Sequence, residues 1–259
     1  MARDLSEEQL EQKAKVDAEI AEKGRQEQQN INQRLHEWYT INEQTWSSCQ
    51  EVAPGSGIWV YRDVLPKDMN ILERLTNVLD DPATEYDWRE AMVGYQMKMP
   101  EYRDCVDFKY KKTDIQETSE AADALRSLAD DVIYRQMQVV KDYTRRYHIG
   151  ELRYWEATNY VRYGVGQHFQ EHHDHGYSYN CVVSLVGFPN DDYEGGELYF
   201  RLQNVQVKAR AGDVYVFPSN FMYPHRAMPV KSGVKYSMVT MLDYSDKYHQ
   251  PDMYQETDS

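Results

Sequence analysis

Two histidines and one aspartate are the residues of this chain best suited to chemistry. His172 and Asp174 are separated by a single residue, and His225 follows much later in the sequence. Two imidazoles and one carboxylate form the ligand set of the 2-His-1-carboxylate iron sites, which leave one face of the metal open to other ligands. The leading hypothesis for this region is therefore a metal site with open coordination positions.

The spacing of the first pair fits a β-strand. Side chains two residues apart on a strand point to the same face and lie roughly 7 Å apart along the chain. On a strand, His172 and Asp174 can reach one ion while His173 points to the other face. The pair His173 and His175 has the same spacing in the opposite phase, so the residues alone leave the register open. They also leave iron, zinc and manganese open as the metal.

The composition indicates one large domain and limits the partners. The 259 residues are 41% hydrophobic and include 22 tyrosines, which is enough for a substantial core. A formal charge of -14 argues against nucleic acid and anionic membranes as partners, because phosphate groups bind clustered positive charge. No apolar run approaches the length that spans a bilayer. The acidic surface favours a neutral or basic peptide over an acidic one.

The cysteines and the N-terminus predict a cytoplasmic protein. Cys49, Cys105 and Cys181 are odd in number, widely spaced and match no zinc motif. Such cysteines are typical of buried thiols in a reducing compartment. The N-terminus begins with charged helix formers and has no signal-peptide apolar segment.

The chain divides into four regions. Residues 1–45 are rich in Glu, Gln, Lys and Ala and predict a charged helical N-terminal arm. Its sparse apolar positions favour a solvated helix, with self-association through a coiled coil as the alternative. Residues 46–151 mix helix and strand and predict a supporting region of the same domain. Residues 152–244 predict a β-rich core, and the polar residues 245–259 a flexible tail.

The fold class predicted from these patterns is mainly β with flanking helices (α+β). Helices are expected from Pro66 to Leu79 and from Thr118 to His148, packed on a sheet. The segment from Trp88 to Lys112 is either an extra strand and turn or a substrate-covering loop. Many short strands with Gly-rich corners favour a barrel or two-sheet sandwich. The strands expected in and just before the core are Ile58–Tyr61, Leu152–Tyr163, Phe169–Asp174, Tyr179–Val186, Glu197–Phe200, Val205–Ala209, Asp213–Phe217 and Lys235–Leu242.

Four blocks of sequence around the metal candidates resemble one known family. The blocks are Tyr163 to Gly166-x-x-Phe169-x-x-His172-x-Asp174, then Tyr193-Glu194-Gly195-Gly196-Glu197-Leu198, then Gly212-Asp213-Val214-x-Val216-Phe217, and His225-x-x-x-Pro229-Val230-x-x-Gly233-x-Lys235-Tyr236. Over residues 152–244 the chain resembles the iron(II)- and 2-oxoglutarate-dependent dioxygenases of the prolyl 4-hydroxylase-like group. The fold of that family is a double-stranded β-helix, or jelly-roll, which agrees with the strand-and-turn pattern.

The resemblance implies roles for five residues. His172, Asp174 and His225 would bind Fe(II), which fixes the register left open above. Lys235 would pair with the distal carboxylate of 2-oxoglutarate, and Tyr163 would hydrogen-bond the same cosubstrate. By strand periodicity alone, Lys235 reads as an exposed lysine and Tyr163 as a core tyrosine. The resemblance also allows L-ascorbate as a further cofactor.

The activity that the resemblance implies is hydroxylation of an unactivated C–H bond, with 2-oxoglutarate and dioxygen as cosubstrates. A prolyl residue in a peptide or protein is the expected target, as in procollagen-proline 4-dioxygenase-like enzymes. Three alternatives are an oxygenase acting on a non-prolyl substrate, a non-catalytic jelly-roll interaction module, and a metal-dependent hydrolase or isomerase. The complete set of His172, Asp174, His225 and Lys235 argues against the last two, because neither has a use for all four residues.

Overall fold

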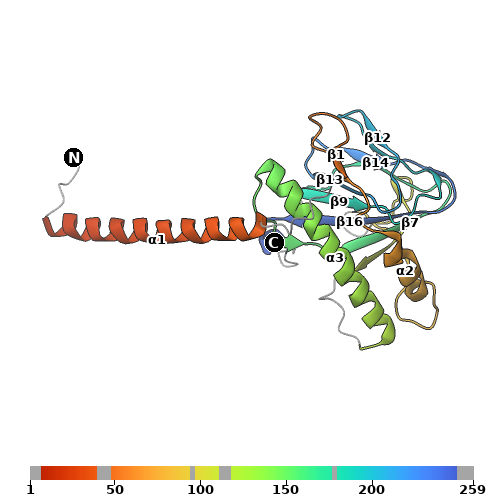
Figure 1. The fold of residues 1–259 in the computed structure, drawn as a ribbon, viewed down its shortest axis with the longest axis horizontal. Coiled ribbons are helices and arrows are strands. Elements are labelled where there is room, and N and C mark those ends of the chain that lie inside the picture. The colour runs from red at the N-terminus through yellow and green to blue at the C-terminus, as the bar shows by residue number, and fades with distance from the viewer. Residues whose placement is uncertain (1–6, 40–47, 94–96, 111–117, 177–179, 250–259) are drawn as a thin grey trace, which may run out of the picture.

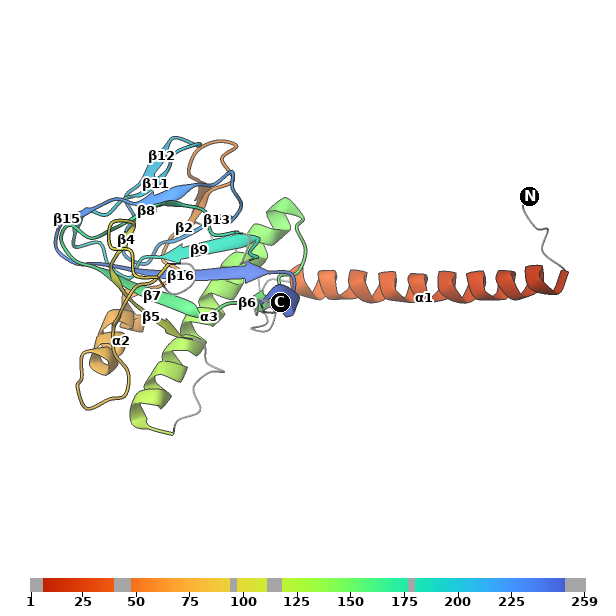
Figure 2. The same ribbon diagram turned by 180° about the vertical axis from the view of Figure 1, so that it is seen from behind.

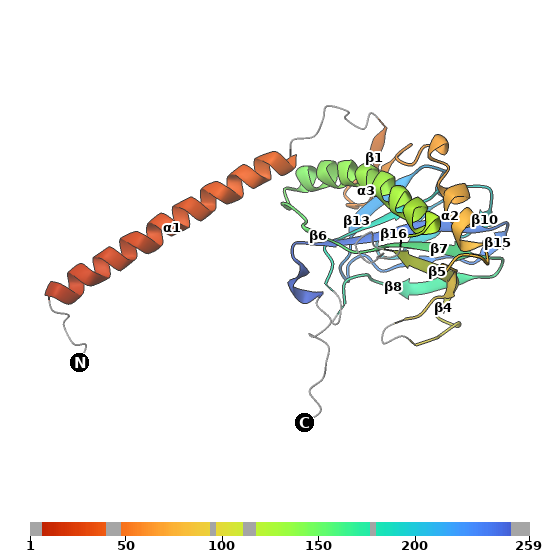
Figure 3. The ribbon, with the colours of Figure 1, turned by 90° about the horizontal axis from the view of Figure 1, so that it is seen from below.

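The computed structural model describes residues 7–39, 48–93, 97–110, 118–176 and 180–249. They form three layers, which are helices, a large sheet and a smaller sheet, and one long helix projects from this body (Figures 1 and 3). The α-helices are α1 (Glu7–Tyr39), α2 (Ile71–Leu79) and α3 (Glu120–Tyr147), with 3-10 turns at η1 (Lys67–Met69) and η3 (Asp246–Tyr248). None of these helices combines the length and the apolarity that crossing a membrane requires.

The larger sheet forms the middle layer. Its strands run in the order β1-β2-β13-β9-β16-β7-β5-β3, and β6 pairs with β16. All pairs in it are antiparallel. The strands are β1 (Cys49–Glu51), β2 (Trp59–Tyr61), β3 (Arg89–Glu90), β5 (Val106–Tyr110), β6 (Tyr154–Trp155), β7 (Thr158–Tyr163), β9 (Val183–Gly187), β13 (Val214–Pro218) and β16 (Lys235–Asp243).

The smaller sheet faces the larger one on the side away from the helices (Figure 2). It has the order β12-β11-β14-β8-β4, and a two-stranded ribbon β10-β15 joins the two sheets at one end. The strands are β4 (Arg103–Asp104), β8 (His168–His172), β10 (Glu194–Gly195), β11 (Leu198–Phe200), β12 (Val205–Val207), β14 (His225–Ala227) and β15 (Val230–Ser232). Two facing antiparallel sheets with helices on one outer face are the jelly-roll architecture expected from the sequence.

Helix α3 supports the larger sheet from outside. Ser119 caps its start by accepting a hydrogen bond from the Ala122 N–H at 3.1 Å, and His148 ends it in the left-handed conformation. Its buried face packs with α2 on the outer face of the sheet, in a core that includes Leu125, Val132 and Tyr160. The inner faces of the two sheets enclose two smaller apolar clusters. The larger sheet is therefore held rigid from behind, and its inner face is the wall of the site described below.

Several predicted boundaries need correction. Helix α2 begins at Ile71, because Pro66 is followed by the separate 3-10 turn η1. The strand predicted to run to Asp174 ends at His172, and Asp174 lies in a bend. The strand predicted from Tyr179 begins at Val183, and residues 177–179 lie outside the described residues. The strand predicted over Leu152–Tyr163 is divided into β6 and β7. Strands β1, β10, β14 and β15 were not predicted.

The arm and the tail were predicted from composition. Helix α1 is a single helix whose described side chains from residue 9 to residue 30 are all exposed. In the tail, η3 forms at Asp246–Tyr248, and residues 250–259 lie outside the described part of the chain.

Candidate metal centre

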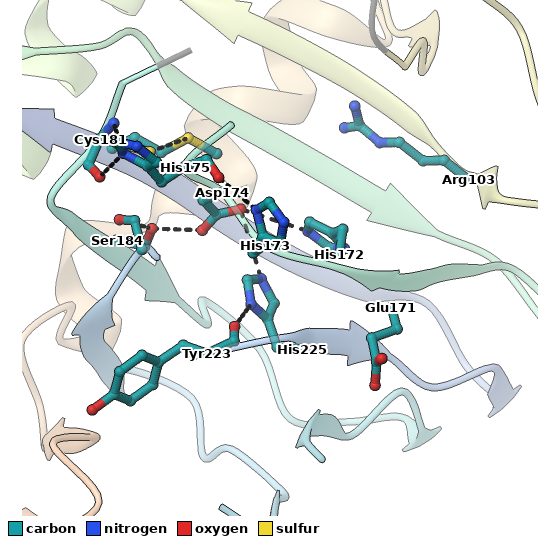
Figure 4. A network of polar contacts seen from close by, with 12 residues as sticks. Arg103, Glu171, His172, His173, Asp174, His175, Cys181, Ser184, Tyr223 and His225 are labelled. Carbon is teal, nitrogen blue, oxygen red and sulfur yellow. Dashed lines mark hydrogen bonds and ion pairs between the residues drawn. The ribbon is translucent and has the colours of Figure 1, made fainter. Parts of the chain in front are cut away.

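The three residues His172, Asp174 and His225 converge at the ends of two paired strands. His172 is the last residue of β8, His225 is the first of β14, and the two are directly opposite in the antiparallel register. Asp174 Oδ1 lies 3.6 Å from His172 Nε2 and 3.7 Å from His225 Nε2. The potential ligand atoms lie within 4.8 Å of one another, which is close enough for one ion to contact all three (Figure 4).

The backbone fixes both imidazole rings. His172 Nδ1 lies 2.8 Å from the Gln170 carbonyl oxygen, and His225 Nδ1 lies 3.0 Å from that of Tyr223. A carbonyl oxygen only accepts hydrogen bonds, so each Nδ1 carries the proton. In the neutral form of each ring, Nε2 carries the free lone pair and lies close to Asp174 Oδ1, which is the arrangement of metal-binding histidines.

Asp174 is held in the same way. Its Oδ2 accepts a hydrogen bond from Ser184 Oγ at 2.5 Å (Figure 4). Ser184 Oγ also lies 2.7 Å from Ser219 Oγ. This bond occupies the far oxygen of the carboxylate and leaves Oδ1 facing the two imidazoles. Ser184 lies on β9, which is paired on both sides, so the orientation of Asp174 is set by an interior strand of the larger sheet.

The electrostatics of the three residues fit a divalent cation. The Asp174 side chain is 3% exposed, and no Lys or Arg pairs with it among the described residues. Burial, reinforced by the nearby His225, lowers the pKa of His172 to about 3, so this ring stays neutral. A buried carboxylate without a Lys or Arg partner favours a positive charge from another source. Imidazole and carboxylate ligands suit Fe(II), so the residues present fit the iron expected from the sequence.

The competing register does not converge. His173 Nδ1 contacts the carbonyl of His175 at 2.5 Å, and His175 Nδ1 lies 2.8 Å from the carbonyl of Cys181. Neither residue belongs to the group of potential ligands that the described part of the chain brings together. The choice of His172 and Asp174 over His173 and His175 therefore agrees with the structure.

Lys235 is buried in the same cavity as the three potential ligands. It is 2% exposed, and its ammonium Nζ donates a hydrogen bond to the Gly196 carbonyl at 2.8 Å. The described residues give it no ion pair, and Nζ lies 4.9 Å from the centre of the Tyr163 ring and 5.5 Å from that of Phe188. Burial lowers its pKa to about 8. A buried ammonium without a carboxylate is costly, so this end of the cavity favours an anionic ligand.

Gly196 makes room for this lysine. A Cβ at Gly196 would lie 2.9 Å from Lys235 Cδ, and the residue has a φ of +64°. The sequence predicted Gly196 only as a corner residue. The structure adds that the absent side chain lets the backbone carbonyl approach the ammonium.

Tyr163 lies directly opposite Lys235 in the pairing of β7 with β16. The side chain is buried, and burial raises the pKa of its phenol, so the group remains a neutral hydrogen-bond donor. Both residues line one cavity of about 350 Å³ together with His172, Asp174 and His225. All five site residues predicted from the sequence therefore share this cavity.

Other cavity residues come from outside the sequence blocks. Met92, Val93, Tyr102 and Arg103 form one wall, and they belong to the segment Trp88–Lys112. That segment contains β3, β4 and β5, so it supplies strands and also lines the cavity. Asn159 on β7 was also missed. Its position four residues before Tyr163, on the same face of a strand, is the signal that could have identified it.

The comparisons with known proteins agree with this geometry. The family model described as the 2OG-Fe(II) oxygenase superfamily matches residues 158–242, which include all five predicted site residues and less than half of the chain. A PKHD-type hydroxylase from Colwellia psychrerythraea is 36% identical over 66 residues. That match covers 25% of this chain and only 28% of the length of the relative.

Solved structures show the fold. A Trichoplax adhaerens prolyl hydroxylase, solved with a peptide of hypoxia inducible factor, has a TM-score of 0.60 at 13% identity, covering 75% of this chain and 87% of that one. A Pseudomonas putida prolyl-4-hydroxylase has a TM-score of 0.52 at 18% identity, covering 74% and 94%. A 2OG-Fe(II) oxygenase family protein from Burkholderia pseudomallei has a TM-score of 0.54 at 13% identity, covering 80% and 94%. The chain is thus similar to 2OG-Fe(II) oxygenases in sequence, and to prolyl hydroxylases in fold.

Proposed function

We propose that this protein is an Fe(II)- and 2-oxoglutarate-dependent dioxygenase that hydroxylates a prolyl residue in a peptide or protein. The observation that carries the proposal is the pairing of two features in one cavity. Lys235 offers a buried cation without an anionic partner among the described residues, and His172, Asp174 and His225 offer a buried metal-ligand set. A short dicarboxylate that also chelates a metal satisfies both.

The residues present assign the binding groups. His172 Nε2, Asp174 Oδ1 and His225 Nε2 would hold Fe(II), and Lys235 would receive the distal carboxylate of 2-oxoglutarate. When bound, the metal and cosubstrate supply the oxidising chemistry that couples decarboxylation of 2-oxoglutarate by dioxygen to C–H hydroxylation. L-ascorbate remains a proposed further cofactor.

The chain orients the reactants and excludes water. The Gln170 and Tyr223 carbonyls and Ser184 keep the three ligand atoms facing inward. Apolar side chains line the cavity around them, among them Val186, Phe188, Leu198 and Val239. A dry, preorganised site strengthens the ion pair at Lys235 and protects the reaction from side reactions with solvent.

The proposal of a prolyl substrate rests on similarity of fold. The neighbours of known fold include prolyl hydroxylases, one of them solved with a peptide. An oxygenase with a non-prolyl substrate is the second candidate, since the cavity itself shows no feature specific to proline. A non-catalytic module would have no use for a buried Lys235 cation. The three free cysteines agree with a reducing compartment, and we keep a cytoplasmic location as a proposal.

The proposal is tested with purified protein, ferrous iron and 2-oxoglutarate. Succinate should form even without substrate, and formation should stop in the His172→Ala variant. A proline-containing peptide library should gain the mass of one oxygen atom on proline. Succinate without any gain on proline, but with a gain on another residue, would favour the second candidate. Absence of succinate and of 2-oxoglutarate binding in the wild type would refute the dioxygenase.

A further inference from the structure

The cavity has a polar side arm that the metal ligands and Lys235 do not use. In the larger sheet, Val186, Val239, Asn159 and Lys109 lie side by side on β9, β16, β7 and β5. All four line the cavity, which therefore extends across the sheet from β9 to β5. Asn159 is the only one of these four residues with an amide side chain, and its strand β7 lies two strands away from β9.

Asp107 fixes which way the Asn159 amide points. Asn159 Nδ2 donates a hydrogen bond to Asp107 Oδ2 at 3.2 Å, and Arg103 Nη2 donates to the same oxygen at 2.7 Å. A carboxylate accepts from the NH2 group and not from the carbonyl oxygen, so the amide cannot be flipped without losing this bond. Asn159 lines the cavity, and its Oδ1 is consequently the amide atom left without a partner among the described residues.

Two buried polar atoms of this network have no hydrogen-bond partner among the described residues. They are Asn159 Oδ1, an acceptor, and Arg103 Nε, a donor. Arg103 is otherwise held in place, because Nη1 donates to the Met92 carbonyl at 2.9 Å and the guanidinium lies 4.9 Å from the centre of the Phe169 ring. Buried polar atoms are nearly always hydrogen-bonded, so both atoms point to a ligand that brings a donor and an acceptor.

The chemistry of Asn159 Oδ1 disfavours the cosubstrate. An amide oxygen repels the carboxylate and keto oxygens of 2-oxoglutarate, which are all acceptors. A peptide backbone carries one N–H donor and one C=O acceptor per residue, which matches the two unpartnered atoms. Met92, Val93 and Tyr102 on the same wall offer apolar contacts to the side chains of such a peptide.

We infer that Asn159 is a specificity-determining residue, which accepts a backbone N–H of an extended peptide substrate while Arg103 Nε donates to a carbonyl of the same peptide. This inference rests on the proposed function and adds the substrate class and its binding contacts. Proline has no backbone N–H, so the N–H comes from a residue beside the target proline. The reacting proline and the recognised N–H therefore belong to different residues.

The test uses a pool of capped proline-centred peptides with randomised flanks, and a matched pool in which the flanking backbone amides are N-methylated. Peptide-dependent succinate formation and the gain of one oxygen atom are measured for wild type, Asn159→Leu and Asn159→Gln. Asn159→Leu removes the acceptor at similar size, and Asn159→Gln keeps both the amide donor for Asp107 and the amide acceptor. Thermal unfolding and the affinity for 2-oxoglutarate of each metal-loaded variant are measured alongside.

We expect N-methylation to raise the half-saturating peptide concentration of the wild type roughly tenfold, as expected for one buried hydrogen bond. In Asn159→Leu, the half-saturating concentration of the unmethylated pool should rise to the value that the wild type shows for the methylated pool. The two pools should then no longer differ. Asn159→Gln should keep its sensitivity to N-methylation, and the affinity for 2-oxoglutarate should not change in either variant.

Three results would overturn the inference while leaving the oxygenase intact. The first is wild-type peptide affinity in Asn159→Leu, and the second is sensitivity of Asn159→Leu to N-methylation. The third is a wild type that turns over 2-oxoglutarate but modifies neither pool. A fourth result, loss of 2-oxoglutarate affinity in Asn159→Leu, would assign Asn159 to the cosubstrate instead. A wild type that does not bind 2-oxoglutarate refutes the proposed function itself, and with it this inference.

Discussion

Lys235 Nζ donates a hydrogen bond to the carbonyl oxygen of Gly196 at 2.8 Å, and the described residues offer the ammonium no ion pair. An ammonium has three donors, so one neutral acceptor leaves it incompletely satisfied. Gly196 contributes both the carbonyl and the space, since a side chain there would collide with the lysine. The pair forms one end of a cavity whose other residues include His172, Asp174 and His225.

Replacement of Lys235 by methionine should separate cosubstrate binding from metal binding. We expect Lys235→Met to weaken 2-oxoglutarate by about a hundredfold, because a charge-assisted hydrogen bond in a dry site is lost. Metal affinity should remain within a few-fold of wild type, since Lys235 is not among the metal ligands. The ligand-free variant should melt at or above the wild-type temperature, because a buried unpaired charge is removed. Calorimetric titration and thermal unfolding check these outcomes, and unchanged 2-oxoglutarate affinity would disprove the role of Lys235.

The lowered pKa of Lys235 predicts a pH dependence. Burial lowers this pKa from 10.5 to about 8, so in the ligand-free protein the ammonium loses its proton above about pH 8. The affinity for 2-oxoglutarate should then fall with rising pH, by up to about tenfold per pH unit. Between about pH 8 and 10.5 the unfolded chain binds the extra proton, so the free energy of unfolding should rise with pH in that window. Lys235→Met should lack both trends, and an affinity independent of pH up to 10 in the wild type would contradict the assignment.

Ser184 should act on the metal through Asp174. In Ser184→Ala, Asp174 Oδ2 loses its hydrogen bond while every potential ligand stays in place. We expect metal affinity to fall roughly 10- to 100-fold, as is typical when the partner that orients a ligand is removed. Ser219→Ala is the matched control, because Ser219 contacts Ser184 and leaves the bond from Ser184 to Asp174 intact. Equal metal affinity in Ser184→Ala and wild type would show that the bond does not orient the carboxylate.

Helix α1 should contribute little to the stability of the body. Its described side chains from residue 9 to residue 30 are exposed, so their removal uncovers little buried apolar surface. A chain lacking residues 1–30 should keep the melting temperature and 2-oxoglutarate affinity of the full chain. Sedimentation should give the monomer mass for both proteins. A dimer of the full chain that becomes a monomer on truncation would instead support a coiled coil through α1.

The sequence was most informative where residues have a regular local pattern. The Gly-rich corners and alternating strands predicted two facing sheets, and the helix Thr118–His148 was placed within two residues of each end of α3. Asp174 was misplaced at the end of a strand because periodicity cannot tell where a strand stops. The short strands β14 and β15 have too few residues for an alternating pattern to be visible.

In the site, too, local patterns could be predicted from the sequence and long-range contacts could not. His172, Asp174 and His225 could be grouped from spacing and resemblance, but only the register of β8 against β14 brings the two histidines opposite each other. Asn159 shares a strand face with Tyr163, but its contact with Asp107, and that of Arg103 with the same carboxylate, join three strands and could not be predicted. Long-range contacts of single polar atoms leave no local signature in the sequence.

Calorimetric titration of 2-oxoglutarate into oxygen-free protein, with and without Fe(II), tests the central claim most directly. The account predicts tight binding of one molecule per chain with Fe(II) and much weaker binding without it. His225→Ala should abolish the effect of the metal, whereas the matched variant His173→Ala should preserve it, since His173 is outside the ligand group. Binding that does not depend on the metal, or that is lost in His173→Ala and kept in His225→Ala, would contradict the account.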